Sequence, residues 1–301
     1  MTPDISVVIP TFRRPALLRR CLQSLADQGL PSEAFEVVVV DDGSGDMTGD
    51  VVAAAAGNVR GLVQPVNAGP AAARNRGVEA AEGRLVLFLD DDIAAAPDLL
   101  ATHLRVHGAG DDDRLGVLGR VDWDPALDVT PFMHWLDRSG LQFGYDTWLQ
   151  EGPVEPPYAA FYTCNVSLHR SLLVASGGFD ERFPYAAFED MELAFRLTSL
   201  GFHLDYRPQA QAFHTRAMEL RGFCTRMQRV GESAELMRKA APEFPLDDDA
   251  LRRRLTSRRR RLLLRLAARR ASARMTEHAH AMHYWAEVAA AYERGRGRVR
   301  K

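Results

Sequence analysis

The sequence predicts an α/β protein whose central sheet is mostly parallel and is covered by helices on both faces. Three observations carry this prediction. Short apolar runs alternate with amphipathic helical segments through the first half, two of those runs end in acidic clusters, and apolar residues make up 46% of the 301 residues. That apolar content excludes a disordered or collagen-like chain. At about 150 residues per domain, the length allows one large domain or two modest ones.

The first half supports this assignment segment by segment. Residues 5–9 form a β-rich apolar run, which Pro10 is expected to end. Residues 15–28 carry leucines at helical spacing, with Pro15 at the start and Gly29 just after the end, as is typical of an amphipathic helix. The same reasoning predicts further strands over 35–40, 59–63 and 85–89, and further helices over 46–56, 70–82 and 97–107.

The second half is less regular. Residues 120–160 carry prolines and aromatic residues without a clear period, so we expect loops and short elements that partly line a pocket. Trp135 and Trp148 in this segment either stack on a sugar or fill the core, and the sequence does not choose between these roles. A helix is predicted over 189–200, ended by Gly201. The segment from Pro242 to Pro245 predicts a boundary, with Arg-rich helices beyond it.

The small net charge of −2 conceals an asymmetry. Residues 251–301 hold 16 basic and 3 acidic side chains, so the rest of the chain is acidic. The basic tail is read as helical, with Leu251, Leu255, Leu262 and Leu266 on one side. Three interpretations stay open: docking on the acidic body or oligomerisation, contact with a membrane surface, and, least favoured, nucleic-acid binding.

The three cysteines, Cys21, Cys164 and Cys224, are far apart and form no CxxC pair. This excludes a disulfide framework and a thiolate zinc site, and it suits a reducing compartment. The first residues show no basic segment followed by an apolar run, and no apolar run approaches the ~18–20 residues of a spanning helix. We therefore expect a cytoplasmic protein, with a peripheral position at the inner membrane face as the alternative.

Acidic clusters follow two of the predicted strands. Asp41 and Asp42 end one strand, and Asp90, Asp91 and Asp92 end another. Because ligands bind at the carboxyl ends of strands in an open α/β sheet, these carboxylates are expected to share one cleft. Their mutual repulsion favours a divalent cation, and oxygen ligands suit Mg²⁺ or Mn²⁺. The predicted ligand is therefore a metal-bound diphosphate.

Six segments carry a family resemblance. They are VVIPTFRRP (7–15), VVVVDDGSGD (37–46), NAGPAAARNRG (67–77), LFLDDDI (87–93), GGFDERF (177–183) and FEDMELAFRL (188–197). Their order and spacing resemble the motif set of family 2 glycosyltransferases, over about residues 4–215. The resemblance implies the GT-A fold, a Rossmann-like αβα sandwich. It also implies an inverting transfer of a sugar from a nucleotide diphosphate (UDP-, GDP- or dTDP-linked) to an acceptor that stays unknown.

The resemblance, together with the boundary at Pro242 to Pro245, predicts a domain plan. Residues 1–240 would form the GT-A domain, with a nucleotide-sugar-binding half over 1–119 and an acceptor-binding half over 120–240. Residues 241–301 would form the basic helical extension.

For the donor half, the resemblance implies that Pro10 and Thr11 close over the base and ribose, and that Asp42 accepts a hydrogen bond from the base. Arg74 would face the nucleotide or its phosphates. Asp92 would be the more direct metal ligand, and Asp90 would also reach the ribose or water. The remaining predicted donor-site residues are Arg13, Asn67 and Asp91. For His214, a further metal ligand and a core histidine are equally open readings.

For catalysis, the resemblance implies that Asp190 is the base that takes the proton of the acceptor hydroxyl. Glu189 is the alternative base, and a plain helix-start carboxylate is the structural alternative for Asp190. A cation would stabilise the leaving diphosphate, and in-line attack would pass through an oxocarbenium-like state and invert the anomeric carbon.

Two other functions are less consistent with the sequence. A sugar-1-phosphate nucleotidyltransferase is disfavoured because residues 10–14 contain no glycine, whereas such enzymes usually open with a Gly-rich phosphate loop. A non-catalytic scaffold working through the basic tail is disfavoured because both the D-x-D pair and the Glu-Asp pair are present. His103 and His107 are expected to be ordinary helix-face residues rather than ligands.

Overall fold

The computed structural model describes residues 2–55, 57–110, 112–246 and 277–299. The chain divides into two compact units. Unit 1 comprises Met1–Asp128 and Gly140–Ala217, and unit 2 comprises Val129–Ser139 and Met218–Lys301. The predicted functional halves that meet near residue 119, and the boundary near residue 240, stay predictions.

Unit 1 is built on a nine-stranded sheet with the order β3-β2-β1-β4-β8-β6-β9-β5, and β7 pairs with β9 beside this path. Strands β1 to β4 are parallel to one another, as are β6 and β9, whereas β8, β5 and β7 run antiparallel to their neighbours. The predicted α/β fold with a mostly parallel sheet is therefore confirmed. The bounds are β1 Ile5–Thr11, β2 Phe35–Asp41, β3 Val59–Val63, β4 Leu85–Leu89, β5 Ile93–Ala95, β6 Leu115–Trp123, β7 Gly152–Val154, β8 Asn165–His169 and β9 His203–His214.

The expected end of the first strand at Pro10 is wrong. Strand β1 continues through Pro10 to Thr11, with Pro10 opposite Val40 of β2. The last pair between β1 and β4 joins Val8 to Phe88, so pairing on that side of β1 has already ended at Pro10. Proline has no amide hydrogen, and it is tolerated at position 10 because no hydrogen bond to β4 is needed there.

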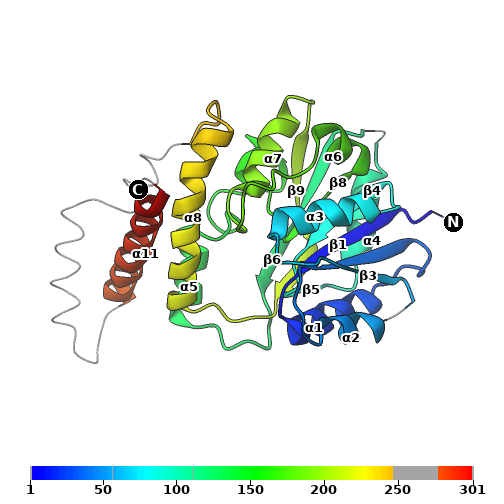
Figure 1. Cartoon of the computed structure of the whole chain (residues 1–301), viewed down its shortest axis with the longest axis horizontal. Helices are drawn as coiled ribbons and strands as arrows, with labels where there is room; N and C mark the ends of the chain where they lie inside the picture. Colours follow the sequence, from blue (N-terminus) through cyan, green and yellow to red (C-terminus); the bar gives the residue numbers. More distant parts are fainter. Residues whose placement is uncertain (1, 56, 111, 247–276, 300–301) are drawn as a thin grey trace. The chain divides into compact units, whose positions relative to one another are not determined.

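Helices cover both faces of the sheet. Helix α3 packs over β1 and β2, where a Cβ on Gly77 would lie 2.3 Å from a methyl group of Val8, and Figure 1 shows it in front of the strands. Val8, Phe88 and Val166 are paired across neighbouring strands, so their side chains lie on the face that α3 covers. Ser167 is the next residue after Val166, so its side chain points to the opposite face. His103 of α4 contacts Ser167, and α4 therefore packs on that opposite face. The helices of unit 1 are α1 Pro15–Ala26, α2 Thr48–Ala53, α3 Pro70–Ala80, α4 Leu99–His107, α6 Arg170–Ser176 and α7 Glu189–Thr198.

The irregular segment 120–160 holds more regular structure than its sequence predicts. It contains the end of β6, helix α5 (Pro131–Ser139), strand β7 and a short 3₁₀ turn, Pro157–Ala159. Strands β5, β6 and β8 and helix α6 are also additions to the predicted elements. Glycines at 116 and 119 weaken the strand pattern of β6, and Pro208 interrupts that of β9.

Unit 2 contains α5, α8 (Leu220–Ala240) and α11 (Glu277–Val299). Helices α8 and α11 run side by side and approach closely, because a Cβ on Gly231 would meet the carbonyl oxygen of Tyr292 at 2.2 Å. The ring of Trp135 is buried and stacks on Phe132 and contacts Trp285. In this structure Trp135 therefore fills a core, whereas Trp148 in unit 1 is 47% exposed.

The predicted leucine stripe at 251–266 lies outside the described residues, as does most of the predicted Arg-rich extension. Within the described ranges, no helix has both the length and the apolar composition needed to span a membrane.

Candidate active site

The candidate site lies at one edge of the sheet in unit 1. Strands β1, β2 and β4 are parallel, so Thr11, Asp41 and the acidic run after Leu89 lie at the same edge. Strand β6 is antiparallel to β8, which is antiparallel to β4, and β9 is parallel to β6. Their ends at Trp123 and His214 therefore reach that edge as well. The topology gathers the predicted carboxylates in one region, as expected for an open α/β sheet.

Two arginines neutralise the acidic run. Arg14 Nη1 lies 3.0 Å from Asp91 Oδ1 and 3.5 Å from Asp92 Oδ2. Arg216 Nε donates to Asp92 Oδ2 at 3.2 Å, and Thr11 Oγ1 donates to Asp91 Oδ2 at 2.8 Å. The carboxylates of Asp91 and Asp92 are buried, so these contacts offset part of the cost of keeping them charged.

The two adjacent carboxyl groups have different acidities. Burial raises the pKa of Asp91 to about 6, although Arg14 and Thr11 oppose the shift. Burial also acts to raise the pKa of Asp92, but the charges of His214, Arg14 and Arg216 outweigh it and lower that pKa below its ordinary value. Asp92 is therefore the member of the pair that holds a negative charge over the wider pH range.

Arg74 joins the acidic run to the Glu-Asp pair. Its Nη1 donates to Glu189 Oε1 at 2.9 Å, and its Nη2 donates to Asp90 Oδ1 at 3.1 Å. The guanidinium also lies over the ring of Phe179, with 5.7 Å to the centroid. The Arg74 side chain is buried, so one cation ties together segments that lie 16 and 115 positions away along the chain.

Glu189 and Asp190 are adjacent but differ in surroundings. Glu189 is buried, its Oε2 atom has no hydrogen-bond partner among the described residues, and burial together with the charge of Asp190 raises its pKa to about 7. Asp190 is half-buried, and its Oδ1 accepts from the Met191 amide at 2.8 Å. Its charge also acts on Arg74 and Tyr162. The residue before the pair, Phe188, has a φ of 72°, a left-handed conformation that bulky residues rarely adopt.

Asp42 organises the loop that carries Asn67. Its Oδ1 accepts from Gln64 Nε2 at 2.6 Å and from the Ala68 amide at 2.8 Å, and its Oδ2 accepts from the Gly69 amide at 2.9 Å. Asn67 itself is exposed in this loop, beside Val66, which is 67% exposed.

Arg13 contacts the second-strand motif. Its amide donates to Ser44 Oγ at 2.8 Å, and its Nε donates to the Ser44 carbonyl at 3.2 Å. Pro10 is half-buried near the end of β1. The predicted donor-site residues therefore fall into three neighbouring groups, around Asp91 and Asp92, around Arg74, and around Asp42 and Ser44.

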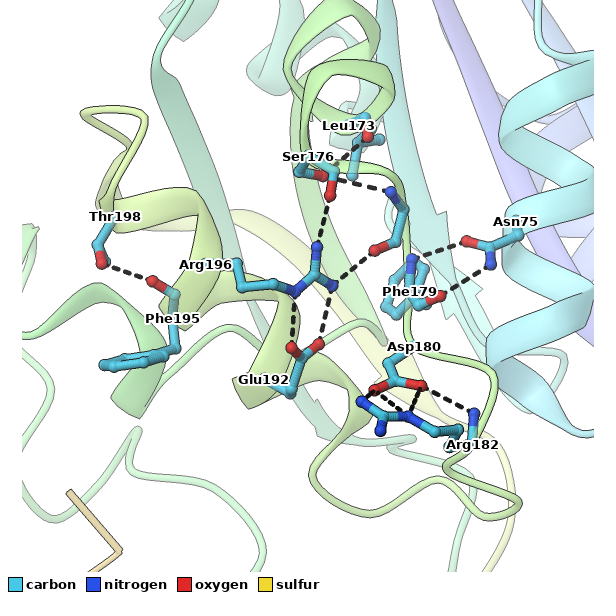
Figure 2. A network of polar contacts seen from close by, with 11 residues as sticks. Asn75, Leu173, Ser176, Phe179, Asp180, Arg182, Glu192, Phe195, Arg196 and Thr198 are labelled. Carbon is cyan, nitrogen blue, oxygen red and sulfur yellow. Dashed lines mark hydrogen bonds and ion pairs between the residues drawn. The ribbon is translucent and has the colours of Figure 1, made fainter. Parts of the chain in front are cut away.

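A second polar network holds the GGFDERF loop (Figure 2). Arg196 of α7 donates to both carboxylate oxygens of Glu192, at 2.6 and 2.8 Å, and to the carbonyls of Ser176 and Gly178, at 2.6 and 2.7 Å. Asn75 of α3 both accepts from the Phe179 amide and donates to the Phe179 carbonyl. The loop that carries Phe179 is thus fastened from α7 and from α3.

The predicted metal ligands lie near one another. His214 Nδ1 is 3.7 Å from Asp92 Oδ1, whereas Arg14 and Arg216 approach Asp92 at its other oxygen, Oδ2. The imidazole stacks on Phe143, with 5.8 Å between ring centroids, and lies beside Trp123 at 5.6 Å. Among the described side chains, no group of three or more His, Cys, Asp or Glu residues is already arranged to hold a metal ion.

The sequence interpretation missed the cations of this site. Arg14 and Arg216 contact the acidic run, yet only Arg13 and Arg74 were named as candidates. A signal was present in the sequence, because each missed arginine lies two or three residues beyond the end of a strand that reaches the same edge. Positive side chains at such ends are expected partners for clustered carboxylates or phosphates.

Comparison with known proteins gives a family. The model described as glycosyl transferase family 2 matches residues 6–168. Validoxylamine A glucosyltransferase from Streptomyces hygroscopicus subsp. limoneus is 36% identical over 222 residues, which cover 66% of this chain and 49% of that protein. Pre-mycofactocin glycosyltransferase from Mycobacterium tuberculosis (strain ATCC 25618 / H37Rv) is 30% identical over 243 residues, covering 80% of this chain and 48% of that protein. The chain thus spans about half the length of these relatives.

Solved structures agree on the fold. Mannosyltransferase PcManGT from Pyrobaculum calidifontis, in complex with GDP-Man and Mn²⁺, gives a TM-score of 0.63 at 20% identity, covering 99% of this chain and 87% of that one. TarS 1-349 from S. aureus, in complex with UDP, gives 0.57 at 18% identity, covering 99% and 91%. These neighbours confirm the GT-A fold that the motifs implied.

Proposed function

Because the chain belongs to glycosyl transferase family 2, we propose that it transfers a sugar from a nucleotide-diphosphate sugar to an acceptor hydroxyl, with inversion at the anomeric carbon. The observation that carries this proposal is the edge at which Asp92, His214, Arg74 and the Glu-Asp pair come together. The neighbours' bound GDP-Man and UDP support a nucleotide-sugar donor.

The donor half rests on charge and loop geometry. Arg14 and Arg216 border the carboxylates of Asp91 and Asp92, and they supply positive charge where a diphosphate would lie. Loop 64–69, fastened to Asp42, together with Pro10 and Thr11 of β1, would accept the base and ribose. In this arrangement Asp42 acts chiefly through the loop that it holds, because both of its oxygens already accept hydrogen bonds from that loop.

A divalent cation fits the donor set. His214 Nδ1 lies 3.7 Å from Asp92 Oδ1, and a carboxylate oxygen suits Mn²⁺ or Mg²⁺, whereas an added imidazole suits a transition metal such as Mn²⁺ better than Mg²⁺. Asp92 and His214 would hold the ion, with Asp90 nearby. When bound, the ion would supply positive charge against the departing diphosphate.

Asp190 is the better candidate for the base. Glu189 is buried and committed to Arg74, so its carboxylate positions the guanidinium rather than meeting an acceptor. Asp190 is half-buried and lies close enough to Tyr162 to act on its pKa. Asp190 would take the proton of the acceptor hydroxyl as the new bond forms on the face opposite the leaving group.

The test measures donor binding and turnover separately. Binding of UDP, GDP and dTDP is measured calorimetrically with and without MnCl₂, and turnover is followed as nucleotide release from the matching sugar nucleotides, with water or added sugars as acceptor. We expect Asp92→Ala to lose nucleotide binding. Asp190→Asn should keep binding but lose turnover by roughly 10²–10⁴-fold.

Glu79→Gln, a change of an exposed carboxylate on α3, is the control and should leave both quantities unchanged. Full turnover in Asp190→Asn would overturn the base assignment. Absence of binding to all three nucleotides by the unmodified chain, with or without the metal, would overturn the donor assignment.

A further inference from the structure

Strands β6 and β9 change register in the middle of their pairing. Gly119 of β6 pairs with Arg207 of β9, but the next residue, Arg120, pairs with Gln211. Strand β9 therefore advances four positions while β6 advances one, and Pro208, Gln209 and Ala210 have no partner on β6. A break of this kind leaves buried carbonyl groups without their ladder hydrogen bonds, and such groups need another donor.

The side chain of Asn165 supplies that donor. Its Nδ2 donates to the Ala210 carbonyl at 2.9 Å and to the Arg120 carbonyl at 3.2 Å, so it bonds both strands at the offset. Asn165 is 0% exposed and starts β8, where it pairs with Leu89, the residue before the acidic run. One amide therefore joins the end of β4 to the offset between β6 and β9.

The space for this amide depends on Gly119. A Cβ at that position would lie 2.2 Å from Asn165 Nδ2 and 2.3 Å from the Ala210 carbonyl oxygen, both too close for any real contact. The absence of a side chain on Gly119 is what lets Asn165 reach Ala210.

A chain of buried hydrogen bonds sets the orientation of the Asn165 amide. His103 Nε2 lies 3.0 Å from Asn165 Oδ1, which accepts because Nδ2 is the donor, so that nitrogen carries the proton. His103 Nδ1 then accepts from Ser167 Oγ at 2.8 Å, and Ser167 Oγ accepts from His107 Nε2 at 2.9 Å. Each donor in the chain points the same way, so the amide cannot turn over without breaking the whole network.

The register beyond the offset places the candidate metal ligand. There Trp123 pairs with His214, and on the other side of β9 Ile93 pairs with His214. Thr215 donates from its amide and from its hydroxyl to the Asp92 carbonyl, at 2.9 and 3.0 Å. Because side chains alternate along a strand, a slip of one residue would turn His214 to the opposite face, away from Asp92.

We propose that Asn165, oriented by His103 and Ser167, is a positioning residue of the donor site: it fixes the offset of β9 against β6 and thereby brings His214 to Asp92. The inference rests on the proposed function only for its effect on nucleotide binding. Its structural content, the placement of the His214 ring, does not depend on that function.

The experiment compares two independent ways of disturbing the offset. Asn165→Asp keeps the side-chain shape but places an oxygen against the carbonyls of Ala210 and Arg120. Gly119→Ala adds a methyl group that displaces the Asn165 amide from those carbonyls. Each should raise the Kd of UDP or GDP in the presence of MnCl₂ at least tenfold. The double variant should bind no more weakly than the weaker-binding single variant, because both changes act on one contact.

The matched control is Leu100→Ala. Leu100 is fully buried on the same helix as His103 but lies outside the network, so its truncation lowers the melting temperature without touching the offset. We expect its Kd for the same nucleotides to stay within twofold of the unmodified chain. Ser167→Ala, which removes only the hydroxyl that orients His103, should have a smaller effect in the same direction as Asn165→Asp, and it serves if Asn165→Asp does not fold.

Long-range ¹H–¹⁵N spectra of the histidine rings give a second readout. The His214 ring signals, assigned with His214→Gln, should shift in Asn165→Asp, Gly119→Ala and Ser167→Ala but not in Leu100→Ala. Unchanged His214 signals in the folded variants, or a loss of nucleotide affinity in Leu100→Ala equal to theirs, would overturn the inference. If the unmodified chain binds none of UDP, GDP and dTDP, the proposed function fails, and the spectra alone decide on Asn165.

Discussion

The guanidinium of Arg74 donates to Glu189 at 2.9 Å, and both side chains are only 2% exposed. The same guanidinium reaches Asp90 at the end of β4. One buried cation therefore connects the acidic run, which we propose faces the donor, with the start of α7, which carries the proposed base.

Replacement of Arg74 should destabilise unit 1 strongly. Arg74→Met keeps much of the apolar volume but leaves the carboxylate of Glu189 buried and unpaired, and removal of one partner of a buried pair typically costs about 3–5 kcal/mol. The measurement is urea unfolding followed by circular dichroism at pH 8, above the pKa of about 7 at which Glu189 ionises in the folded chain. Arg76→Met, an exposed site on the same helix, is the control and should change the free energy of unfolding by less than about 0.5 kcal/mol. Equal losses would show that Arg74 does not hold the structure through Glu189.

Glu189 should make the stability fall as the pH rises. Its pKa is raised from 4.5 to about 7 in the folded state, so between these values the native form holds a proton that the unfolded form has lost. The free energy of unfolding should therefore decrease across this window, by about 1.4 kcal/mol for each unit of pKa difference. In Glu189→Gln the decrease should be smaller, and the two proteins should approach each other in stability near pH 5. Parallel curves for the two proteins between pH 5 and 7.5 would contradict this.

Two adjacent glycines offer a test of the Asn75 contact. Both have a positive φ, but a Cβ on Gly178 would lie 2.5 Å from Asn75 Oδ1, whereas a Cβ on Gly177 would meet nothing within 4 Å. Both replacements place an alanine at a positive φ, and they differ in the contact with Asn75, so the difference between the two variants reports chiefly that clash. Gly178→Ala should be less stable than Gly177→Ala by roughly 1–3 kcal/mol, measured by denaturant unfolding. Equal free energies of unfolding for the two variants would contradict the prediction, because they would show that the loop or Asn75 moves aside without a loss of stability.

Figure 2 contains two ion pairs with different surroundings: Arg196 with Glu192, which also bonds the loop, and Arg182 with Asp180, which is more exposed. Arg196 makes four hydrogen bonds through a planar fork, two of them to loop carbonyls, and a lysine cannot reproduce them. We expect Arg196→Lys to lower the free energy of unfolding by about 2 kcal/mol. Arg182→Lys, which alters an exposed pair with Asp180, should cost about 0–1 kcal/mol. A larger loss for Arg182→Lys would reverse the assigned importance of the two pairs.

The first half of the fold was predictable because its signals are local. Strands β3 and β4 start and end where the pattern predicts, and α3 lies within its predicted range. The second half was harder, because β8 and β5 are short antiparallel strands and the pattern of β6 and β9 is broken by glycine and proline. Their pairing depends on partners distant in the sequence, which periodicity alone does not reveal.

The site was predictable as a region but not as a set of contacts. Asp90, Arg74 and Glu189 were each singled out, yet nothing local indicates that one arginine joins the other two across 115 positions. The sequence also could not show that Glu189 is buried against Arg74 whereas Asp190 is only half-buried. Arg14 and Arg216 were missed because a charged residue just past a strand is ordinarily solvated.

The position of β8 in the sheet has a consequence for folding during synthesis. Strands β1 to β4 are complete by residue 89, but β8, which covers the free side of β4, starts only at Asn165. Every side chain of β4 is apolar and buried in the finished sheet. In a nascent or truncated chain that ends between residues 89 and 165, β4 would be an unpaired apolar edge strand. A second copy of the chain could then pair with that edge. Fragments ending near residue 110 are therefore expected to aggregate more readily than fragments that include β8.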